Sequence, residues 1–219
     1  MRVISLNVSK PRTVIHDGGK VRTGIFKQPV VGPRAVRRLG IEGDGQADHR
    51  YHGGPDQAVY AYPVEHYAVW QQELGRAAMP FGQFGENLTT EGLDETGVMV
   101  GDRLRIGGAL CEVTHPRLPC SKLAMRMEAG KDFVKRFQQS GRLGFYLRVL
   151  EEGEIAAGDH IDLIATSDAS VSIAEFLETY AAKRPKRDAL LRVLAAPGLS
   201  QGWRARFEKK LGGAPGSDT

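Results

Sequence analysis

Cysteine is scarce in this chain of 219 residues, which contains only Cys111 and Cys120. Two cysteines without a CxxC motif do not make the disulfide framework of a small secreted protein, and they cannot hold an iron–sulfur cluster of their own. The first residues read as a strand and not as a signal peptide. We therefore expect a cytoplasmic protein whose thiols stay reduced.

Long apolar runs are missing as well. No segment approaches the roughly 18 consecutive apolar residues that a membrane-spanning helix needs, so we expect no membrane association. Hydrophobic residues make up 41% of the chain and charged residues 26%, a balance typical of a globular protein with a sizeable core.

The common nucleotide and hydrolase motifs are absent too. The sequence has no GxxxxGK[ST], GxGxxG or GxSxG, so it predicts neither a P-loop, nor a dinucleotide site, nor the nucleophile of an α/β-hydrolase. His49 and His52 lie three residues apart without a second matched pair of ligands. This spacing argues against a structural zinc site.

Glycine and proline are plentiful by contrast, with 27 and 11 residues. Frequent turns favour short strands. Apolar alternation indicates strands at residues 3–8, 24–26, 34–39, 58–62, 98–106, 109–114, 145–150 and 160–164, and helical spacing indicates helices at 64–74 and 132–140. We therefore predict a mainly β domain with added helices over residues 1–165.

The last part of the chain has a different character. Residues 165–170 are small and polar, which suits a linker. Ser172 and Glu175 form a capping box, Pro185 suits the first turn of a second helix, and Ser200 can cap a third. The sequence thus predicts a small three-helix domain over residues 166–219, docked on the β domain or on a second subunit because it is too small to be very stable alone.

Positive charge is concentrated in these helices. The chain carries a net charge of +4, and nine of its Lys and Arg residues lie between residues 183 and 210 against Asp188 and Glu208. A solvated helical face or a homodimer contact explains this cluster better than nucleic-acid binding, which we do not expect.

A rigid segment leads to Cys120. The sequence THPRLPC at residues 114–120 follows a predicted strand, and its two prolines hold the backbone extended. Arg117 and His115 bring positive charge that favours the thiolate, the form that attacks electrophiles or ligates a soft metal. The alternative is that Cys120 is a small buried core residue, as most free cysteines are.

A second cluster lies between two strands. Residues 42–56 contain four carboxylates, two histidines and four glycines. Glycines permit close approach of the backbone to a ligand, with His52 at the lip of such a loop and Asp48 beside it. We favour a ligand site here over a long turn whose Asp and His side chains only cap its own backbone.

Two further loops carry candidate binding residues. The sequence FGENLTTEGL at residues 84–93 presents Glu86 as an acceptor and Asn87 as an amide. The sequence SGRLGFY at residues 140–146 places Arg142 between glycines as a clamp for a phosphate or carboxylate. The alternatives are that Asn87 holds a turn and that Arg142 is a solvated cation at a helix C-terminus.

Four motifs in order resemble the MOSC domain, which is named after the C-terminal domain of molybdenum cofactor sulfurase. They are GDGQAD at 43–48 with HGG at 52–54, FGENL at 84–88, GD at 101–102, and PRLPC at 116–120. The opening strand and the helical tail are similar to the YiiM-like bacterial subgroup, over about residues 1–211. The resemblance implies a MOSC-type β-barrel domain followed by a small C-terminal three-helix bundle.

The resemblance also implies an activity. It implies binding of the molybdenum cofactor, a pterin dithiolene (molybdopterin) with a terminal phosphate, and reduction of N-hydroxylated compounds such as 6-hydroxylaminopurine, a detoxification of base analogues. Reductive N–O cleavage consumes two electrons, which no side chain supplies, so the metal would carry them. They would come from a separate flavin or iron–sulfur donor protein.

The resemblance implies the role of Cys120, and the chemistry of the other residues indicates theirs. Cys120 is expected to be the thiolate ligand of molybdenum, with Asp48 and His52 as groups that relay protons. The expected cofactor-binding residues are Cys120, Asn87, Glu86, Arg34, Arg117 and Arg142, the three arginines being candidates for the phosphate. An alternative is a cofactor or sulfur carrier, in which Cys120 accepts a persulfide or the domain only shelters the pterin.

Overall fold

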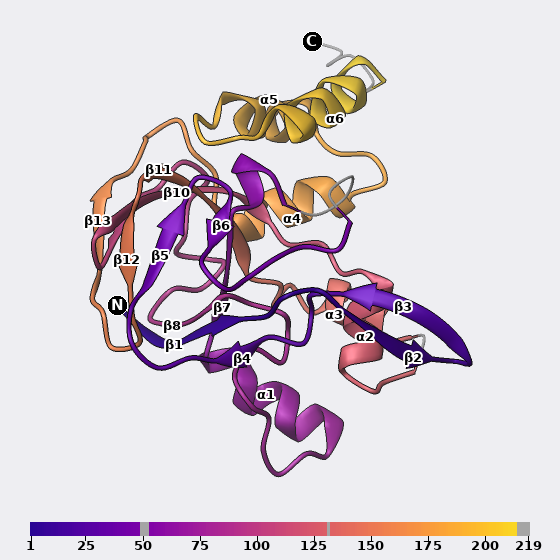
Figure 1. The fold of residues 1–219 in the computed structure, drawn as a ribbon. Helices are drawn as coiled ribbons and strands as arrows, with labels where there is room; N and C mark the ends of the chain where they lie inside the picture. The colour runs from indigo at the N-terminus through magenta and orange to yellow at the C-terminus, as the bar shows by residue number, and fades with distance from the viewer. Residues whose placement is uncertain (49–52, 131, 214–219) are drawn as a thin grey trace.

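The computed structural model describes residues 1–48, 53–130 and 132–213, and its centre is a curved sheet (Figure 1). In this part of the chain eight strands follow one another across the sheet in the order β13-β9-β10-β11-β7-β8-β1-β4. Neighbouring strands are antiparallel, except β7 and β8, which are parallel. The bounds are β1 (Arg2–Val8), β4 (Gln28–Pro29), β7 (Val59–Pro63), β8 (Leu88–Glu91), β9 (Arg103–Ile106), β10 (Ala109–Pro116), β11 (Phe145–Glu151) and β13 (Ile161–Ala165).

The predicted class, mainly β with added helices, is confirmed, but the sheet is not closed into a barrel. It curls until the start of β1 meets the segment before β13, where Arg2 and His160 form an isolated bridge. The Val3 amide also donates to the Asp159 carbonyl at 2.9 Å. Further along β1, Asn7 and Val8 pair with β4 instead. A continuous ladder between β1 and β13 does not form because two segments share one edge of β1.

A hairpin of β2 (Arg12–His16) and β3 (Gly19–Thr23) projects from the molecule (Figure 1). Asp17 and Gly18 at its tip have φ of 48° and 75°, the positive values that a two-residue hairpin turn of type I′ requires. The strand predicted at residues 24–26 is wrong, since the chain is irregular there. The hairpin strands are mostly exposed, so no buried face imposes the alternation that would have marked them in the sequence.

The remaining strands form a small sheet of their own. It contains β5 (Arg34–Arg37), β6 (Gly40–Ile41) and β12 (Gly153–Ile155), in the order β12-β5-β6. Only β5 lies in a segment that the sequence predicts to be a strand. The predicted strand at residues 98–106 shortens to β9, because residues 98–102 form a turn and a bridge instead.

A second, aromatic core lies beside the sheet. Helices α1 (Glu65–Leu74) and α3 (Phe133–Gln139) bury Trp70 and Phe137 against Tyr62 and Phe84, and the rings of Tyr62 and Phe84 stack at 4.2 Å. Both helices were predicted, and α1 ends where Gly75 adopts φ 63°. The short helices η1 (Pro55–Gln57) and α2 (Ser121–Arg126) were not predicted.

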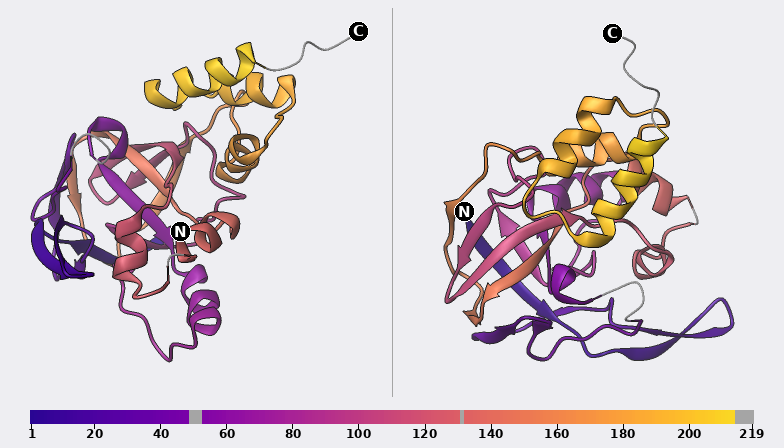
Figure 2. Two further views of the ribbon diagram at one scale, coloured as in Figure 1. Left: turned by 90° about the vertical axis from the view of Figure 1, so that its right-hand side faces the viewer. Right: turned by 90° about the horizontal axis from the view of Figure 1, so that it is seen from above.

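The three C-terminal helices pack on the main core (Figure 2). They are α4 (Ile173–Ala181), α5 (Arg187–Ala195) and α6 (Gln201–Gly212). Ser172 and Glu175 form the predicted capping box, whereas Pro185 precedes a helix that begins at Arg187. Gly198 fits closely against the sheet, because a Cβ there would lie 2.5 Å from the Gly101 Cα atom.

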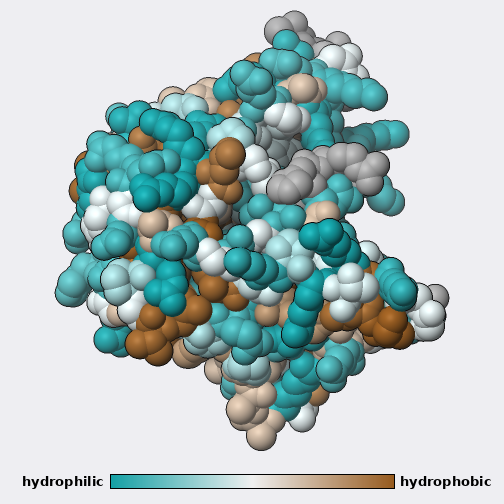
Figure 3. All heavy atoms as spheres, in the orientation of Figure 1, coloured by the Kyte–Doolittle hydropathy of each residue, from teal (hydrophilic) through white to brown (hydrophobic). Residues whose placement is uncertain are grey.

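The described helices differ from what a membrane span requires. Among the helices of residues 1–48, 53–130 and 132–213, none combines the length and the apolar character that crossing a bilayer requires. The face drawn in Figure 3 is hydrophilic over most of its area, and its outline is indented between the C-terminal helices and the β2–β3 hairpin.

Candidate functional site

The proline-rich segment carries Cys120 from the end of a strand to the start of a helix. β10 pairs with β11 as far as Pro116, opposite Phe145. The Arg117 amide then donates to the Gly144 carbonyl at 3.1 Å. Cys120 is extended, with φ −131° and ψ 164°, and precedes the first residue of α2. The predicted extended approach to the cysteine is therefore seen at both ends of the segment.

Arg117 lies directly beside this cysteine. Its Nη2 atom is 3.8 Å from Cys120 Sγ, and the residue is only 4% exposed. Burial opposes the positive charge, but Cys120 and the tyrosines around it outweigh this effect and raise the pKa of Arg117. The Nη1 atom has no hydrogen-bond partner within the described ranges. A buried cation with a spare donor next to a thiol is an electrostatic site for an anion.

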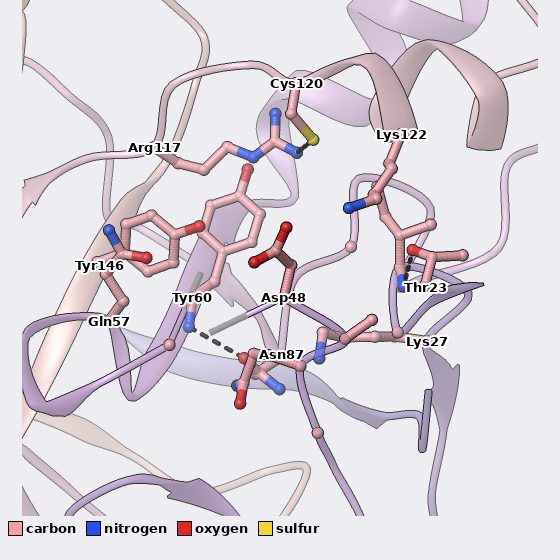
Figure 4. Close-up of a pocket in the computed structure, with 17 residues that line it drawn as sticks. Thr23, Lys27, Asp48, Gln57, Tyr60, Asn87, Arg117, Cys120, Lys122 and Tyr146 are labelled. Carbon is pink, nitrogen blue, oxygen red and sulfur yellow. Dashed lines mark hydrogen bonds between the residues drawn. The ribbon is translucent and has the colours of Figure 1, made fainter. Parts of the chain in front are cut away.

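Cys120 and Arg117 face an open cavity (Figure 4). Its walls come from the end of the hairpin, the glycine-rich loop, the turn before β8 and the segment around Cys120, and from single residues of η1, β7 and β11. Its lining residues are Thr23, Gly24, Ile25, Lys27, Gly45, Gln46, Ala47, Asp48, Gly53, Gln57, Tyr60, Gly85, Asn87, Arg117, Cys120, Lys122 and Tyr146. Cys120 is half-buried at this wall, so it is not merely a core residue.

The floor of the cavity is a neutralised ion pair. Lys27 and Asp44 form a buried salt bridge, and burial lowers the pKa of Lys27 while Asp44 opposes this effect. Asn87 fixes the pair in place, because its Nδ2 donates to Asp44 Oδ2 at 2.9 Å and its Oδ1 accepts from the Tyr60 amide at 3.1 Å. Asp44 thus has a structural role, as does Asp56, which pairs with Arg148 at 2.6 Å.

Four of the predicted residues come together at this cavity. Cys120, Arg117, Asn87 and Asp48 all line it. The Asp48 carboxylate points into the middle of the cavity, with Cys120 and Arg117 on one side and Asn87 on the other (Figure 4). His52, predicted as a catalytic residue, lies outside the described residues.

Three other predicted residues lie elsewhere. Glu86 is fully buried, and its carboxylate accepts hydrogen bonds from the amides of Gly82 and Phe84 and from two hydroxyls. Arg142 pairs with Glu73 at 2.5 Å, and Arg34 donates to the Pro33 carbonyl at 2.8 Å. None of the three lines the cavity. Burial raises the pKa of Glu86. The Glu86 side chain therefore supports the loop from inside and does not face the cavity.

His115 does not supply the positive charge that the sequence led us to expect. Burial, with Arg148 and Arg206 nearby, lowers its pKa to about 3, so the imidazole is neutral at physiological pH. Arg117 therefore supplies the charge beside Cys120. The sequence could not show that Arg117, and not His115, carries the charge, because both residues lie within five positions of Cys120 and only their packing differs.

Sequence reasoning also missed several lining residues. Lys122 follows Cys120 by two residues, a proximity that could have indicated it as a second cation. Tyr60 and Tyr146 come from adjacent strands that pair at these two residues. Nothing in their local sequence separates them from core tyrosines.

The residues of the cavity fit a phosphorylated, sulfur-bearing cofactor. Arg117 and Lys122 offer positive charge to a phosphate, and the Cys120 thiolate is a soft ligand. Gly85 has φ 79°, and a Cβ at this position would lie 2.8 Å from the Ile25 side chain. The turn can therefore approach Ile25 this closely only with glycine at residue 85. No group of three or more His, Cys, Asp or Glu side chains among the described residues could hold a metal.

The fold and the site define a β-rich protein that presents one cysteine beside a buried arginine in an open cavity, with three helices docked on its sheet. The MOSC domain family matches residues 48–162, and the family described as YiiM-like, 3-alpha helix domain matches residues 171–213. The chain belongs to the MOSC domain family, in its YiiM-like form. MOSC domains are, as a family, molybdenum cofactor-binding.

Individual relatives agree with this assignment. The chain is 43% identical over 210 residues to the uncharacterized protein YflK of Bacillus subtilis, covering 95% of this chain and 93% of YflK. The crystal structure of YiiM from Geobacillus stearothermophilus has a TM-score of 0.81 and 38% identity, covering 96% of this chain and 98% of that one. A protein named reductase, from Gibberella moniliformis, is 37% identical over 150 residues, which is 67% of this chain but 26% of the fungal protein.

Proposed function

We propose that this protein is a molybdenum-cofactor-dependent reductase that cleaves the N–O bond of N-hydroxylated compounds such as 6-hydroxylaminopurine. The observation that carries the proposal is the pair of Cys120 and buried Arg117 at the wall of an open cavity. Membership of the MOSC domain family and the relative named reductase support it. The reaction would take place in the cytoplasm, where the Cys120 thiol stays reduced.

The residues of the cavity have distinct roles in this proposal. Cys120 would bind molybdenum as a thiolate, and Arg117 would stabilise that negative charge. Arg117 and Lys122 would bind the phosphate of the cofactor, while Asn87 would keep the Lys27–Asp44 floor neutral and rigid. When bound, the cofactor supplies the metal that passes two electrons to the substrate.

The overall reaction balances with an external electron donor. The substrate R–NHOH takes up two electrons and two protons, its N–O bond breaks, and R–NH₂ and water leave. Asp48 faces the cavity and would supply one of these protons. The electrons would come from a separate flavin or iron–sulfur protein, and the reaction would convert a mutagenic base analogue into a normal base.

The test is expression with molybdenum cofactor biosynthesis intact, followed by metal analysis and a reduction assay with 6-hydroxylaminopurine. We expect stoichiometric molybdenum in the wild type and loss of both metal and activity in Cys120→Ala. Cys111→Ala is the matched control, because Cys111 is buried in the core away from the cavity. A Cys120→Ala variant that keeps molybdenum and activity would contradict the proposal.

The same experiment separates the reductase from a sulfur carrier built on the same cysteine. A carrier would show a persulfide on Cys120 by mass spectrometry and no turnover with any reductant. A reductase turns over with a chemical reductant and needs no persulfide.

A further inference from the structure

Cys120 also borders a second cavity, on the side of the C-terminal helices. This groove runs between the segment Pro116 to Cys120 and helix α6, which contributes Trp203 and Arg206. Gln57, Cys120, Lys122 and Tyr146 line both the groove and the cavity described above. The cysteine and three neighbours therefore form a partition with a space on each side.

The groove differs in chemistry from the first cavity. The first cavity is lined by glycines and buried cations, whereas the groove is lined by prolines and by the rings of His115, Tyr146 and Trp203. The indole of Trp203 is held rigidly, because Phe176 and Tyr180 pack edge-on against it, each at 4.9 Å. Preformed aromatic walls suit a flat ring, which gains contact area at little entropic cost.

The inner wall of the groove holds an unsatisfied polar pair. His115 Nε2 lies 3.3 Å from Gln57 Nε2, and His115 is 3% exposed. Within the described ranges, neither His115 Nδ1 nor Gln57 Oε1 has a hydrogen-bond partner. A neutral imidazole has one donor and one acceptor nitrogen. Whichever way the Gln57 amide is turned, its contact with His115 uses one nitrogen of the ring, so the pair keeps one donor group and one acceptor atom without a partner. A ligand with a hydroxylamino group beside a ring nitrogen offers one donor and one acceptor that complement them.

A guanidinium covers the outer side of the groove. Arg206 is exposed and lies over the Trp203 ring at 4.7 Å from its centroid. A flat heterocycle that enters the groove can stack on this cation or on the ring beneath it. The C-terminal helices would then contribute directly to substrate binding.

We propose that this groove is the substrate site: it receives a flat, N-hydroxylated nitrogen heterocycle between Tyr146 and the Trp203–Arg206 pair, with Gln57 and His115 hydrogen-bonding to its polar edge. The inference rests on the proposed function, since a metal held by Cys120, which borders both spaces, would meet the hydroxylamino group of the substrate where the two spaces adjoin. Gln57 is half-buried and borders both spaces, so a rotation of its side chain presents its amide to the ligand.

The test uses three variants of the full chain. Ser121→Trp fills the groove from an exposed residue that does not line the cofactor cavity. Arg206→Ala removes the stacking cation, and Lys209→Ala, which removes another exposed cation of α6 outside the groove, is the control. Molybdenum content, KM for 6-hydroxylaminopurine and calorimetric binding of the same compound to cofactor-free protein are measured for each.

We expect Ser121→Trp to abolish calorimetric binding and Arg206→Ala to raise KM by about tenfold, the usual scale of one lost cation–π contact in a binding site. Molybdenum content should stay at the wild-type value, and Lys209→Ala should match the wild type throughout. If both groove variants are active and keep the wild-type KM and the wild-type binding, the groove assignment is overturned. The reductase proposal then still stands. A molybdenum-loaded wild type that binds the compound in the groove without reducing it would instead overturn the reductase proposal alone.

Discussion

His115 of β10 and Trp203 of α6 face each other with ring centroids 6.0 Å apart. The C-terminal helices thus contact the strand that leads to Cys120, five residues before the cysteine.

The buried imidazole makes stability depend on pH. The pKa of His115 is lowered to about 3 in the folded protein, against about 6.5 in an unfolded chain. The unfolded state therefore binds the extra proton between these values, and the stabilisation present above pH 6.5 is lost as the pH falls towards 3. From pH 7 to pH 5 this residue should remove about 2 kcal/mol from the free energy of unfolding.

Urea denaturation at the two pH values measures this effect as a difference between proteins. His115→Phe should lose less stability than the wild type on going to pH 5, whereas the exposed control His16→Gln should behave like the wild type. Equal losses in His115→Phe and the wild type would mean that His115 is not the group responsible.

The contact between the helices and the sheet is tested at a glycine. Gly198→Ala should lower the free energy of unfolding by about 1–3 kcal/mol, because the new methyl group would lie 2.5 Å from both the Gly101 Cα and the Val113 carbonyl oxygen. Gly202→Ala is the matched control, since nothing lies within 4 Å of its Cβ position in α6. It should stabilise the helix by about 0.5–1 kcal/mol, and thermal or urea denaturation of both variants gives the comparison.

Arg117 should control the reactivity of Cys120. Replacing it with leucine removes the cation 3.8 Å from Sγ, so the thiolate is less stabilised and alkylation of Cys120 at pH 7 should slow severalfold. The rate is followed by mass spectrometry with iodoacetamide on cofactor-free protein. Arg34→Leu and Arg142→Leu should leave the rate unchanged, because neither arginine lines the cavity; slowing of the same size in those variants would refute a local effect.

Glu86 should matter for stability and not for binding. Glu86→Ala leaves two amides and the hydroxyls of Tyr67 and Thr89 without their acceptor in a buried site, which should cost about 3 kcal/mol or more. Glu86→Gln retains one acceptor oxygen and should cost less. Urea denaturation tests the order, and a variant with alanine as stable as the wild type would show that the carboxylate is dispensable.

The sequence predicted those features that depend on interactions between residues close together in the chain. The capping box at Ser172, the glycine that ends α1 and the alternation in β1 each act within a few residues, so they could be read directly. β8 was missed because Thr89 and Thr90 are buried without being apolar, and the β2–β3 hairpin was missed because it has no buried face.

The candidate site was predictable to a more limited extent. Cys120, Asp48, Arg117 and Asn87 belong to motifs that the sequence displays, and the structure brings them together. The three candidate arginines look equivalent in sequence, yet only Arg117 follows a strand whose pairing continues to Gly144 and turns the side chain inward. Lys122 and Trp203 depend on packing between distant segments, which no local pattern records.

The shared partition of Gln57, Cys120, Lys122 and Tyr146 has a thermodynamic consequence. A ligand on one side of this wall would contact side chains that also face the other side, so the two proposed binding equilibria would be linked. Linkage is reciprocal. If bound cofactor changes the affinity for substrate by a certain factor, bound substrate changes the affinity for cofactor by the same factor. Tight retention of the cofactor would therefore depend on the compound that occupies the groove.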